Sequence, residues 1–167
     1  MIGNDVIDIL QSRKESNWKR KGFIEKIYTQ EEQLLIYNAV DPEIMVWMLW
    51  SMKEAAYKVY HRETKIREYN PKKLECFIES QTKDTIQGKV ICCNTTYYTK
   101  TILSNDSIHT IAVSTFNSLK MVIEIKNQSI VKDQNGIPYL YLSLQNKMQE
   151  VSKSHHGRFE KVVCIQS

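Results

Sequence analysis

The longest regular pattern in the chain is a run of apolar residues at helical spacing. It predicts a helix from about residue 44 to 61 with a broad buried face. The residues of that face are Ile44, Trp47, Met48, Ala55 and Val59. Asp41 followed by Pro42 predicts its start, because aspartate caps helix N-termini and proline suits the first helical position. Thr29 and Glu32 have the spacing of a capping box and predict a shorter helix before it.

Strand-like patterns occupy the beginning and the second half of the chain. Residues 4–10 are apolar and β-branched enough for a short strand with an acid near its start, and a basic, helix-prone stretch follows. After Pro71 the chain changes to short β-rich runs, separated in places by turn-forming residues. These runs are 74–78, 86–92, 97–103, 108–114, 121–125 and 137–142. Helices followed by strands predict an α+β fold with an antiparallel sheet packed on the long helix.

The composition is that of a globular domain. The chain has 167 residues, of which 42% are hydrophobic and 25% charged. These values exclude the disordered and fibrous classes and suffice for one domain with its own core. The first residues lack the basic and apolar runs of a signal peptide, and no stretch has the length of a membrane span. We therefore expect a single domain over residues 1–167, located in the cytoplasm and not in a membrane.

Cysteine usage and charge narrow the chemistry. The cysteines lie in apolar, strand-like settings without CxxC spacing, so we expect reduced core thiols and no zinc site at Cys76, Cys92, Cys93 and Cys164. The net charge is only +4, but one early segment is basic and would attract an acidic partner. This basic segment consists of Arg13, Lys14, Lys19, Arg20 and Lys21. A solvated helix face and a nucleic-acid contact are the alternative interpretations.

Two carboxylates and a lysine form the first candidate constellation. Glu54 and Lys58 lie one turn apart on the long helix, which is also the spacing of an ordinary ion pair. Asp5 stands at the head of the first predicted strand, two residues after Gly3, which lets another backbone or a ligand approach. Asp5 and Glu54 together would supply two hard oxygen ligands for magnesium and leave positions for water and phosphate.

A second constellation lies near the C-terminus. Residues 152–159, SKSHHGRF, combine hydroxyls, imidazoles, a lysine and an arginine, a set of donors that suits a phosphate. Adjacent residues of a strand face opposite sides, so we do not expect His155 and His156 to bind one ion. His61 and His109 have no accompanying motif, and we expect both to be structural.

These blocks, in this order, resemble the phosphopantetheinyl transferase superfamily. The matching blocks are Gly3-Asn4-Asp5, residues 23–32, the Trp-Ser-Met-Lys-Glu-Ala helix from Trp50 to Lys58, residues 132–139 and the serine-histidine block at 152–159. The resemblance spans most of the chain. It implies transfer of the 4'-phosphopantetheine group of coenzyme A to a serine of an apo acyl carrier protein, with release of adenosine 3',5'-bisphosphate.

The resemblance also implies a role for each site residue. Asp5 and Glu54 would hold Mg²⁺, and Lys58 would contact the pyrophosphate. Ser154 and His155 would bind the 3'-phosphate of coenzyme A, with Lys153 or Arg158 as helpers. Either Glu54 or a metal-bound water would take the serine proton. Because acyl carrier proteins are acidic, the residues expected to dock them are Arg13, Lys14, Arg20 and Lys21.

The chain also departs from the family pattern. Ile7 stands where the larger, secondary-metabolism group has a further acid, and Asp8 lies one residue beyond that position. Residues 1–114 read as a nearly complete module, and residues 120–167 as C-terminal strands that carry the serine-histidine block. Monomeric and trimeric assemblies both stay open, with the site within one chain or shared between subunits. The rival functions are a non-catalytic coenzyme A or phosphate-binding relative and a basic nucleic-acid-binding domain.

Overall fold

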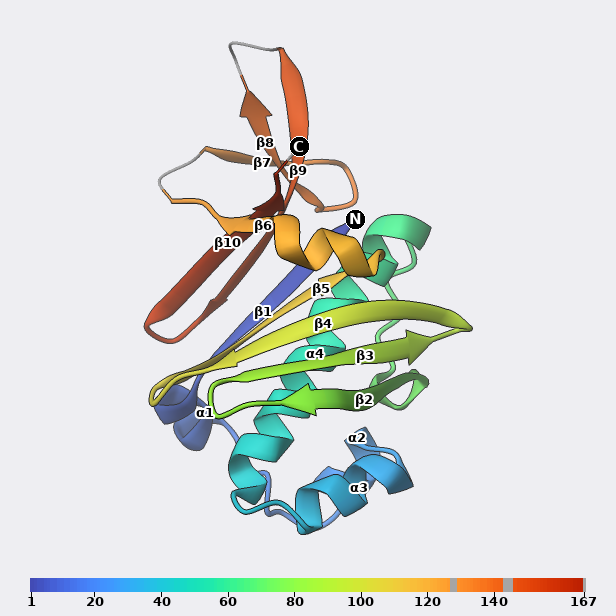
Figure 1. Cartoon of the computed structure of the whole chain (residues 1–167), viewed down its shortest axis with the longest axis vertical. Helices are drawn as coiled ribbons and strands as arrows, with labels where there is room; N and C mark the ends of the chain where they lie inside the picture. The colour runs from blue at the N-terminus through green and yellow to red at the C-terminus, as the bar shows by residue number, and fades with distance from the viewer. Residues whose placement is uncertain (127–128, 143–145, 167) are drawn as a thin grey trace.

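The computed structural model describes residues 1–126, 129–142 and 146–166 and has an α+β fold, as predicted. Helices precede most of the strands along the chain, and antiparallel sheets form the remainder (Figure 1). The helices are α1 (Ile9–Glu15), α2 (Phe23–Ile27), α3 (Gln30–Tyr37) and α4 (Pro42–Thr64), with short 3-10 turns η1 (Pro71–Lys73) and η2 (Phe116–Met121). No helix in the described ranges is both long and apolar enough to cross a membrane.

The strands form two five-stranded sheets. The first has the order β1-β5-β4-β3-β2, and its strands are β1 (Ile2–Asp8), β2 (Leu74–Gln81), β3 (Thr85–Cys92), β4 (Thr95–Leu103) and β5 (Ser107–Val113). The second has the order β6-β10-β9-β8-β7, and its strands are β6 (Val122–Glu124), β7 (Ile130–Lys132), β8 (Pro138–Leu142), β9 (Lys147–His156) and β10 (Phe159–Ile165). Strand β1 therefore lies at one edge of the first sheet.

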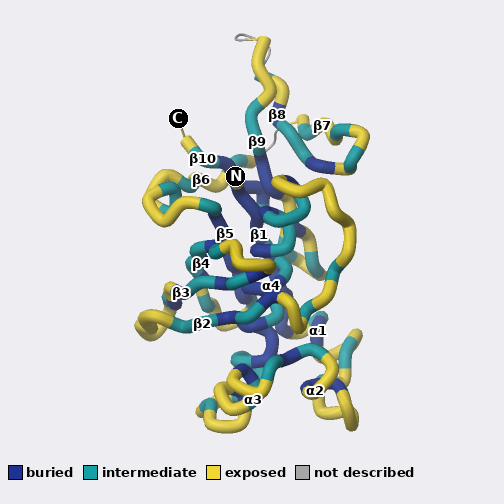
Figure 2. The backbone as a smooth tube through the Cα atoms, turned by 90° about the vertical axis from the view of Figure 1, so that its right-hand side faces the viewer, coloured by how far each residue is buried: buried dark blue, intermediate teal, exposed yellow. Residues whose placement is uncertain are grey.

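Helix α4 supplies the core of the larger part of the molecule. It crosses one face of the first sheet (Figure 1), and its buried side runs along the centre of the molecule (Figure 2). The fully buried residues of α4 include Val46, Leu49, Met52, Ala55, Ala56 and Val59. The Asp41 side chain accepts from the Ile44 N–H and so caps the helix as predicted. The capping box of Thr29 and Glu32 is also present, at the start of α3.

The second sheet meets β1 through side chains instead of backbone pairing. Three β1 N–H groups each donate to a β9 side chain, and the sequence offset is 148 in every pair, so the two strands run parallel. The bonds run from Asn4 to Ser152 Oγ (2.8 Å), from Val6 to Ser154 Oγ (3.0 Å) and from Asp8 to His156 Nδ1 (2.9 Å). We call this row the side-chain ladder. It satisfies N–H groups that the edge of a sheet would otherwise leave unpaired.

The structure corrects several details of the sequence analysis. The first strand ends at Asp8 instead of residue 10, because the Asp8 carboxylate accepts from the Leu10 and Gln11 N–H groups and starts α1. Cys93 is exposed and not a core thiol, since it lies in the tight turn between β3 and β4. All six β-rich runs named after Pro71 coincide with strands. Strands β7, β9 and β10 lie within residues 120–167, which were expected to form strands, but no bounds were predicted for them.

Candidate functional site

A close approach of β1 to α4 builds the site. A Cβ atom on Gly3 would overlap the Ala55 carbonyl oxygen and lie 3.1 Å from Lys58 Cβ, so only glycine allows this packing. The Lys58 ammonium then donates to the Asn4 carbonyl oxygen at 2.6 Å and lies 3.4 Å from Asp5 Oδ1. The glycine of the Gly3-Asn4-Asp5 motif thus brings the aspartate to the face of α4 that carries the lysine.

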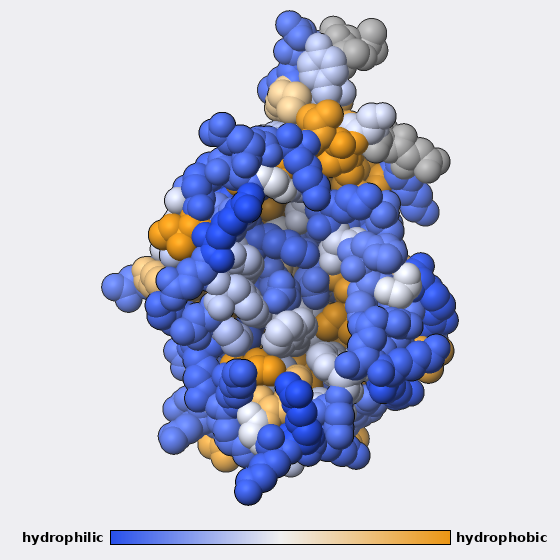
Figure 3. All heavy atoms as spheres, turned by 180° about the vertical axis from the view of Figure 1, so that it is seen from behind, coloured by the Kyte–Doolittle hydropathy of each residue, from blue (hydrophilic) through white to orange (hydrophobic). Residues whose placement is uncertain are grey.

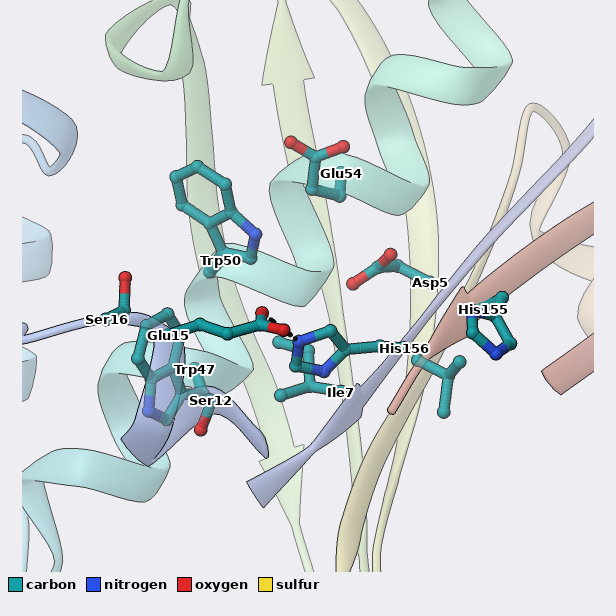
Figure 4. Close-up of a pocket in the computed structure, with 11 residues that line it drawn as sticks. Asp5, Ile7, Ser12, Glu15, Ser16, Trp47, Trp50, Glu54, His155 and His156 are labelled. Carbon is teal, nitrogen blue, oxygen red and sulfur yellow. Dashed lines mark hydrogen bonds and ion pairs between the residues drawn. The ribbon is translucent and has the colours of Figure 1, made fainter. Parts of the chain in front are cut away.

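Asp5 and Glu54 line the same pocket, which has a volume of about 310 Å³. Asp5 projects from β1 and Glu54 from α4, with the Trp50 indole beside Glu54 (Figure 4). Away from the carboxylates the pocket is lined by Ile7, Ser12, Glu15, Ser16, Trp47 and His156. We call it the carboxylate pocket. It brings together the two acids that sequence analysis selected as metal ligands.

Burial shapes the electrostatics of the carboxylate pocket. Desolvation, and secondarily the charge of Asp5, raise the pKa of Glu54. The Tyr69 hydroxyl is buried close to Glu54, and its ring makes edge contacts with Trp50 and Tyr57. Burial and the nearby Glu54 charge raise the pKa of Tyr69. A cation bound between the acids would offset the unfavourable burial of negative charge.

A second pocket, of about 320 Å³, is rich in positive charge. Its basic residues are Lys58, His61, Arg62, Lys132, Lys153 and His155, and Gly136 to Pro138 of the hairpin before β8 close one side. We call it the basic pocket. His155 lines both pockets, and Lys58 of the basic pocket contacts Asp5 of the other. The two pockets therefore meet near His155 and Lys58.

The face of the molecule that carries α4 is hollowed near its centre, and hydrophilic side chains surround the hollow (Figure 3). A ligand can reach this face from solvent without a change in the core. The surrounding surface is polar, which suits a charged substrate better than a lipid.

The donor set fits magnesium. Mg²⁺ is commonly bound through one or two carboxylates, with water and substrate phosphates as its other ligands. In the described ranges no group of three or more His, Cys, Asp or Glu side chains could hold a metal by itself. Asp5 and Glu54 on facing elements would supply two oxygen ligands beside a basic pocket, and this arrangement would leave the remaining ligands to substrate and water.

Two predicted phosphate contacts lie elsewhere in the structure. The Arg158 Nε and Nη2 atoms donate to the Asp8 carboxylate at 2.8 and 2.9 Å, and Arg158 lines neither pocket. Ser154 is 6% exposed and its hydroxyl contacts the Val6 N–H and Asp5 Oδ1. By contrast, His155 lines both pockets, and Lys153 lines the basic pocket while pairing with Glu160 at 2.9 Å.

Asp8 is unsuited to hold a metal, because its carboxylate oxygens are already engaged. Besides the bonds from the Arg158 guanidinium, they accept from the backbone N–H groups of Leu10, Gln11 and Arg158. The Arg158 guanidinium holds the pKa of Asp8 well below its usual range, against the opposing effect of burial. Asp8 therefore caps α1 and ties it to the β9–β10 turn.

The hydrogen bonds of His156 leave neither ring nitrogen free to act as a general base. Its Nδ1 accepts from the Asp8 N–H at 2.9 Å, which requires the lone pair to be on that nitrogen. Its Nε2 lies 3.0 Å from Glu15 Oε2 and donates the remaining proton there. His156 bonds to Asp8 and Glu15, whereas His155 lines the basic pocket, and both histidines border the carboxylate pocket.

The basic segment is exposed, but its members differ. Arg13 makes a two-pronged ion pair with Glu43, with 2.8 Å between Nη2 and Oε2. Lys14, Lys19, Arg20 and Lys21 are exposed on α1 and the loop after it. Lys14, Arg20 and Lys21 are therefore better candidates for contact with an acidic partner than Arg13.

Sequence reasoning missed part of the site. His61 and Arg62 follow Lys58 by three and four residues on α4, so helical spacing alone would have placed them on its face. Tyr69 lies in the loop after α4, where no periodicity relates it to Glu54. Lys53, although part of the motif helix, is fully buried against Glu32 and lines neither pocket.

Comparison with known proteins defines the class. The family model of the 4'-phosphopantetheinyl transferase superfamily matches residues 1–114, and the chain belongs to this superfamily. A search of curated proteins found no match. Among solved structures, the holo-[acyl-carrier-protein] synthase (AcpS) of Thermotoga maritima is similar in fold, with 14% sequence identity and a TM-score of 0.50. The alignment covers 99% of this chain and 83% of that one.

Proposed function

We propose that this chain transfers the 4'-phosphopantetheine group of coenzyme A to a serine of an apo acyl carrier protein and depends on Mg²⁺. The observation that carries the proposal is the junction of the two pockets, where Asp5, Glu54, Lys58 and His155 of one chain meet. Membership of the transferase superfamily supports the reaction class, and the site supports its substrate and metal.

The order of chemical groups in coenzyme A matches the order of the pockets. The 3'-phosphoadenosine would occupy the basic pocket, with His155 and Lys153 near its phosphate. The pyrophosphate would lie at the junction, between Lys58 and the two carboxylates. The pantetheine arm would extend along the end of the carboxylate pocket formed by Ile7, Trp47 and Trp50, where apolar side chains can pack against it.

Positioning and charge neutralisation supply most of the catalysis in phosphoryl transfer. Asp5 and Glu54 would hold Mg²⁺, which would stabilise the negative charge that develops on the pyrophosphate. Lys58 would stabilise the departing adenosine 3',5'-bisphosphate. Glu54 and a metal-bound water are the candidates for accepting the proton of the carrier serine.

Mass spectrometry of an apo acyl carrier protein tests this proposal. The carrier is incubated with the protein, coenzyme A and Mg²⁺, beside Asp5→Ala and Glu54→Ala variants. We expect a gain of one phosphopantetheine that a chelator and both substitutions abolish. Glu79→Gln is the matched control, because Glu79 is a carboxylate paired with Lys89 outside both pockets and should leave the gain unchanged.

Failure has a defined meaning. If several apo carriers gain no mass although the protein binds coenzyme A, the chain is a non-catalytic binding relative. If it binds RNA or DNA with strong salt dependence and does not bind coenzyme A, the nucleic-acid-binding alternative is correct.

A further inference from the structure

The Ser154 hydroxyl uses its hydrogen-bonding capacity inside the protein. It accepts from the Val6 N–H at 3.0 Å and donates to Asp5 Oδ1 at 3.1 Å. Its side chain belongs to a buried residue, 6% exposed, and Ser154 is absent from the lining of both the carboxylate and the basic pocket. A hydroxyl in this position is poorly placed to bind a substrate phosphate but directly contacts a metal-ligand candidate.

The two oxygens of Asp5 have different surroundings. Oδ1 has two neighbouring donors, the Ser154 hydroxyl at 3.1 Å and the Lys58 ammonium at 3.4 Å. Among the described residues no hydrogen bond or ion pair reaches Oδ2. Because both donors approach the same oxygen, they fix the rotation of the carboxylate and leave Oδ2 as its free electron-pair donor.

We propose that Ser154 is a positioning residue that orients Asp5 for the metal, and that it does not bind the 3'-phosphate of coenzyme A. This inference rests on the proposed function, which makes Asp5 a magnesium ligand. Carboxylates that bind metals are themselves commonly hydrogen-bonded, and removal of such a partner typically weakens metal affinity 10- to 100-fold.

Ser152 provides a matched control for metal binding on the same strand, and it differs from Ser154 in lining the basic pocket. It is 3% exposed, and its hydroxyl accepts from the Asn4 N–H at 2.8 Å, as Ser154 accepts from Val6. Both serines therefore contribute one bond to the side-chain ladder, but of the two only Ser154 also donates to the Asp5 carboxylate. Alanine at either position removes the same type of ladder bond, and only Ser154→Ala also releases the carboxylate.

Direct metal binding, measured without substrate, provides a readout other than turnover. Mn²⁺ accepts the same oxygen ligands as Mg²⁺ and is detected by electron paramagnetic resonance. We expect Ser154→Ala to weaken Mn²⁺ binding about 10- to 100-fold, Ser152→Ala to leave it almost unchanged, and Ser154→Thr, which keeps a hydroxyl, to restore most of it. Chemical denaturation should give similar unfolding free energies for the two alanine variants.

A ligand comparison separates positioning from phosphate binding. Without metal, Ser154→Ala should bind coenzyme A and its analogue that lacks the 3'-phosphate as tightly as the wild type does. A loss of affinity for coenzyme A alone would overturn the inference, because it would assign Ser154 to the 3'-phosphate.

The metal titration separates this inference from the proposed function. If the wild type and Ser154→Ala bind Mn²⁺ equally well, only the positioning role is wrong. The same holds if Ser154→Ala and Ser152→Ala lose affinity for Mn²⁺ to the same extent. A wild type that binds no Mn²⁺, either alone or with coenzyme A present, would overturn the metal site, and with it the role of Ser154.

Discussion

Lys53 and Glu32 form an ion pair with no exposed side-chain surface, and 2.7 Å separates Nζ from Oε2. The Lys53 ammonium also donates to the carbonyl oxygens of Pro71 and Leu74, while Glu32 accepts from the Cys76 and Thr29 N–H groups. The pair thus joins α3, α4 and β2 and lies outside both pockets. The lysine that precedes Glu54 in the motif has a structural role.

Substitution of Lys53 should therefore reduce stability more than substitution of a surface lysine does. We expect Lys53→Met to lower the free energy of unfolding by about 3 to 5 kcal/mol, since it leaves Glu32 buried without its partner. Lys73→Met breaks an exposed pair with Glu68 and should cost at most about 1 kcal/mol. Denaturant titration measures both, and equal costs would contradict the structural role of Lys53.

Gly3→Ala should damage the site through the backbone. The added methyl group would overlap the Ala55 carbonyl oxygen and push β1 away from α4, separating Asp5 from Glu54. A displacement of about 1 Å at such a site can reduce the rate about a hundredfold. Gly22→Ala controls for backbone strain without a clash, because its φ of +80° disfavours alanine but a Cβ there meets no atom within 4 Å. A Gly3→Ala enzyme with normal turnover would refute the close approach.

The ion pair of Asp8 predicts a pH dependence of stability. Its folded-state pKa lies below the usual value of 3.8, so the bond to Arg158 contributes above that pH and is lost as the pH falls through and below it. We expect Asp8→Asn to be less stable than the wild type at pH 7. The difference should shrink as unfolding is measured below about pH 4, and a constant difference would count against the pair.

For Glu54 we expect the opposite dependence of stability on pH. Because burial raises its pKa, the folded chain holds this proton at a higher pH than the unfolded chain does, and stability falls as the pH rises through that range. Without metal at pH 7, Glu54→Gln should therefore unfold at a higher denaturant concentration than the wild type. Addition of Mg²⁺ should stabilise the wild type and leave the variant unaffected. A less stable Glu54→Gln protein would show that the carboxylate is favourably bound within the fold.

If the exposed residues of the basic segment dock the carrier, the KM for the carrier should depend on salt. Arg20→Glu and Lys21→Glu should raise the KM for an acidic carrier and leave kcat nearly unchanged. Raising the salt from about 0.05 to about 0.3 M should have the same effect on the wild type. Lys120→Glu, an exposed charge reversal outside this segment, serves as the control. If KM is insensitive to salt, docking does not depend on these charges.

Local sequence signals were sufficient for α3, for α4 and for the selection of the two acids, whereas α2 was not predicted. The capping box at Thr29, the cap at Asp41 and the apolar spacing of α4 each act within a few residues, and they determined the helices closely. The Gly3-Asn4-Asp5 and Trp50 to Lys58 blocks selected Asp5 and Glu54, which line one pocket. The roles of these acids as metal ligands stay predictions.

The contacts of Ser154 could not be predicted in the same way. Its partner Asp5 lies 149 residues away, and β9 lacks the alternation of apolar and polar residues that identifies a half-buried strand. Its polar side chains at Ser152 and Ser154 are buried because they serve the edge of β1, a demand that only the assembled fold creates. The same applies to Arg158, which pairs with Asp8 across 150 residues.

The side-chain ladder makes the seam between the two sheets dependent on residue identity. Ordinary strands pair through backbone groups that every residue except proline provides, so such a joint tolerates most substitutions. Here each rung requires a particular hydroxyl or imidazole, and a single exchange removes one rung without touching the others. Substitutions can therefore remove the bonds between β1 and β9 one at a time. Among the three bonds of the ladder, the one at Ser154 is made by a hydroxyl that also contacts Asp5.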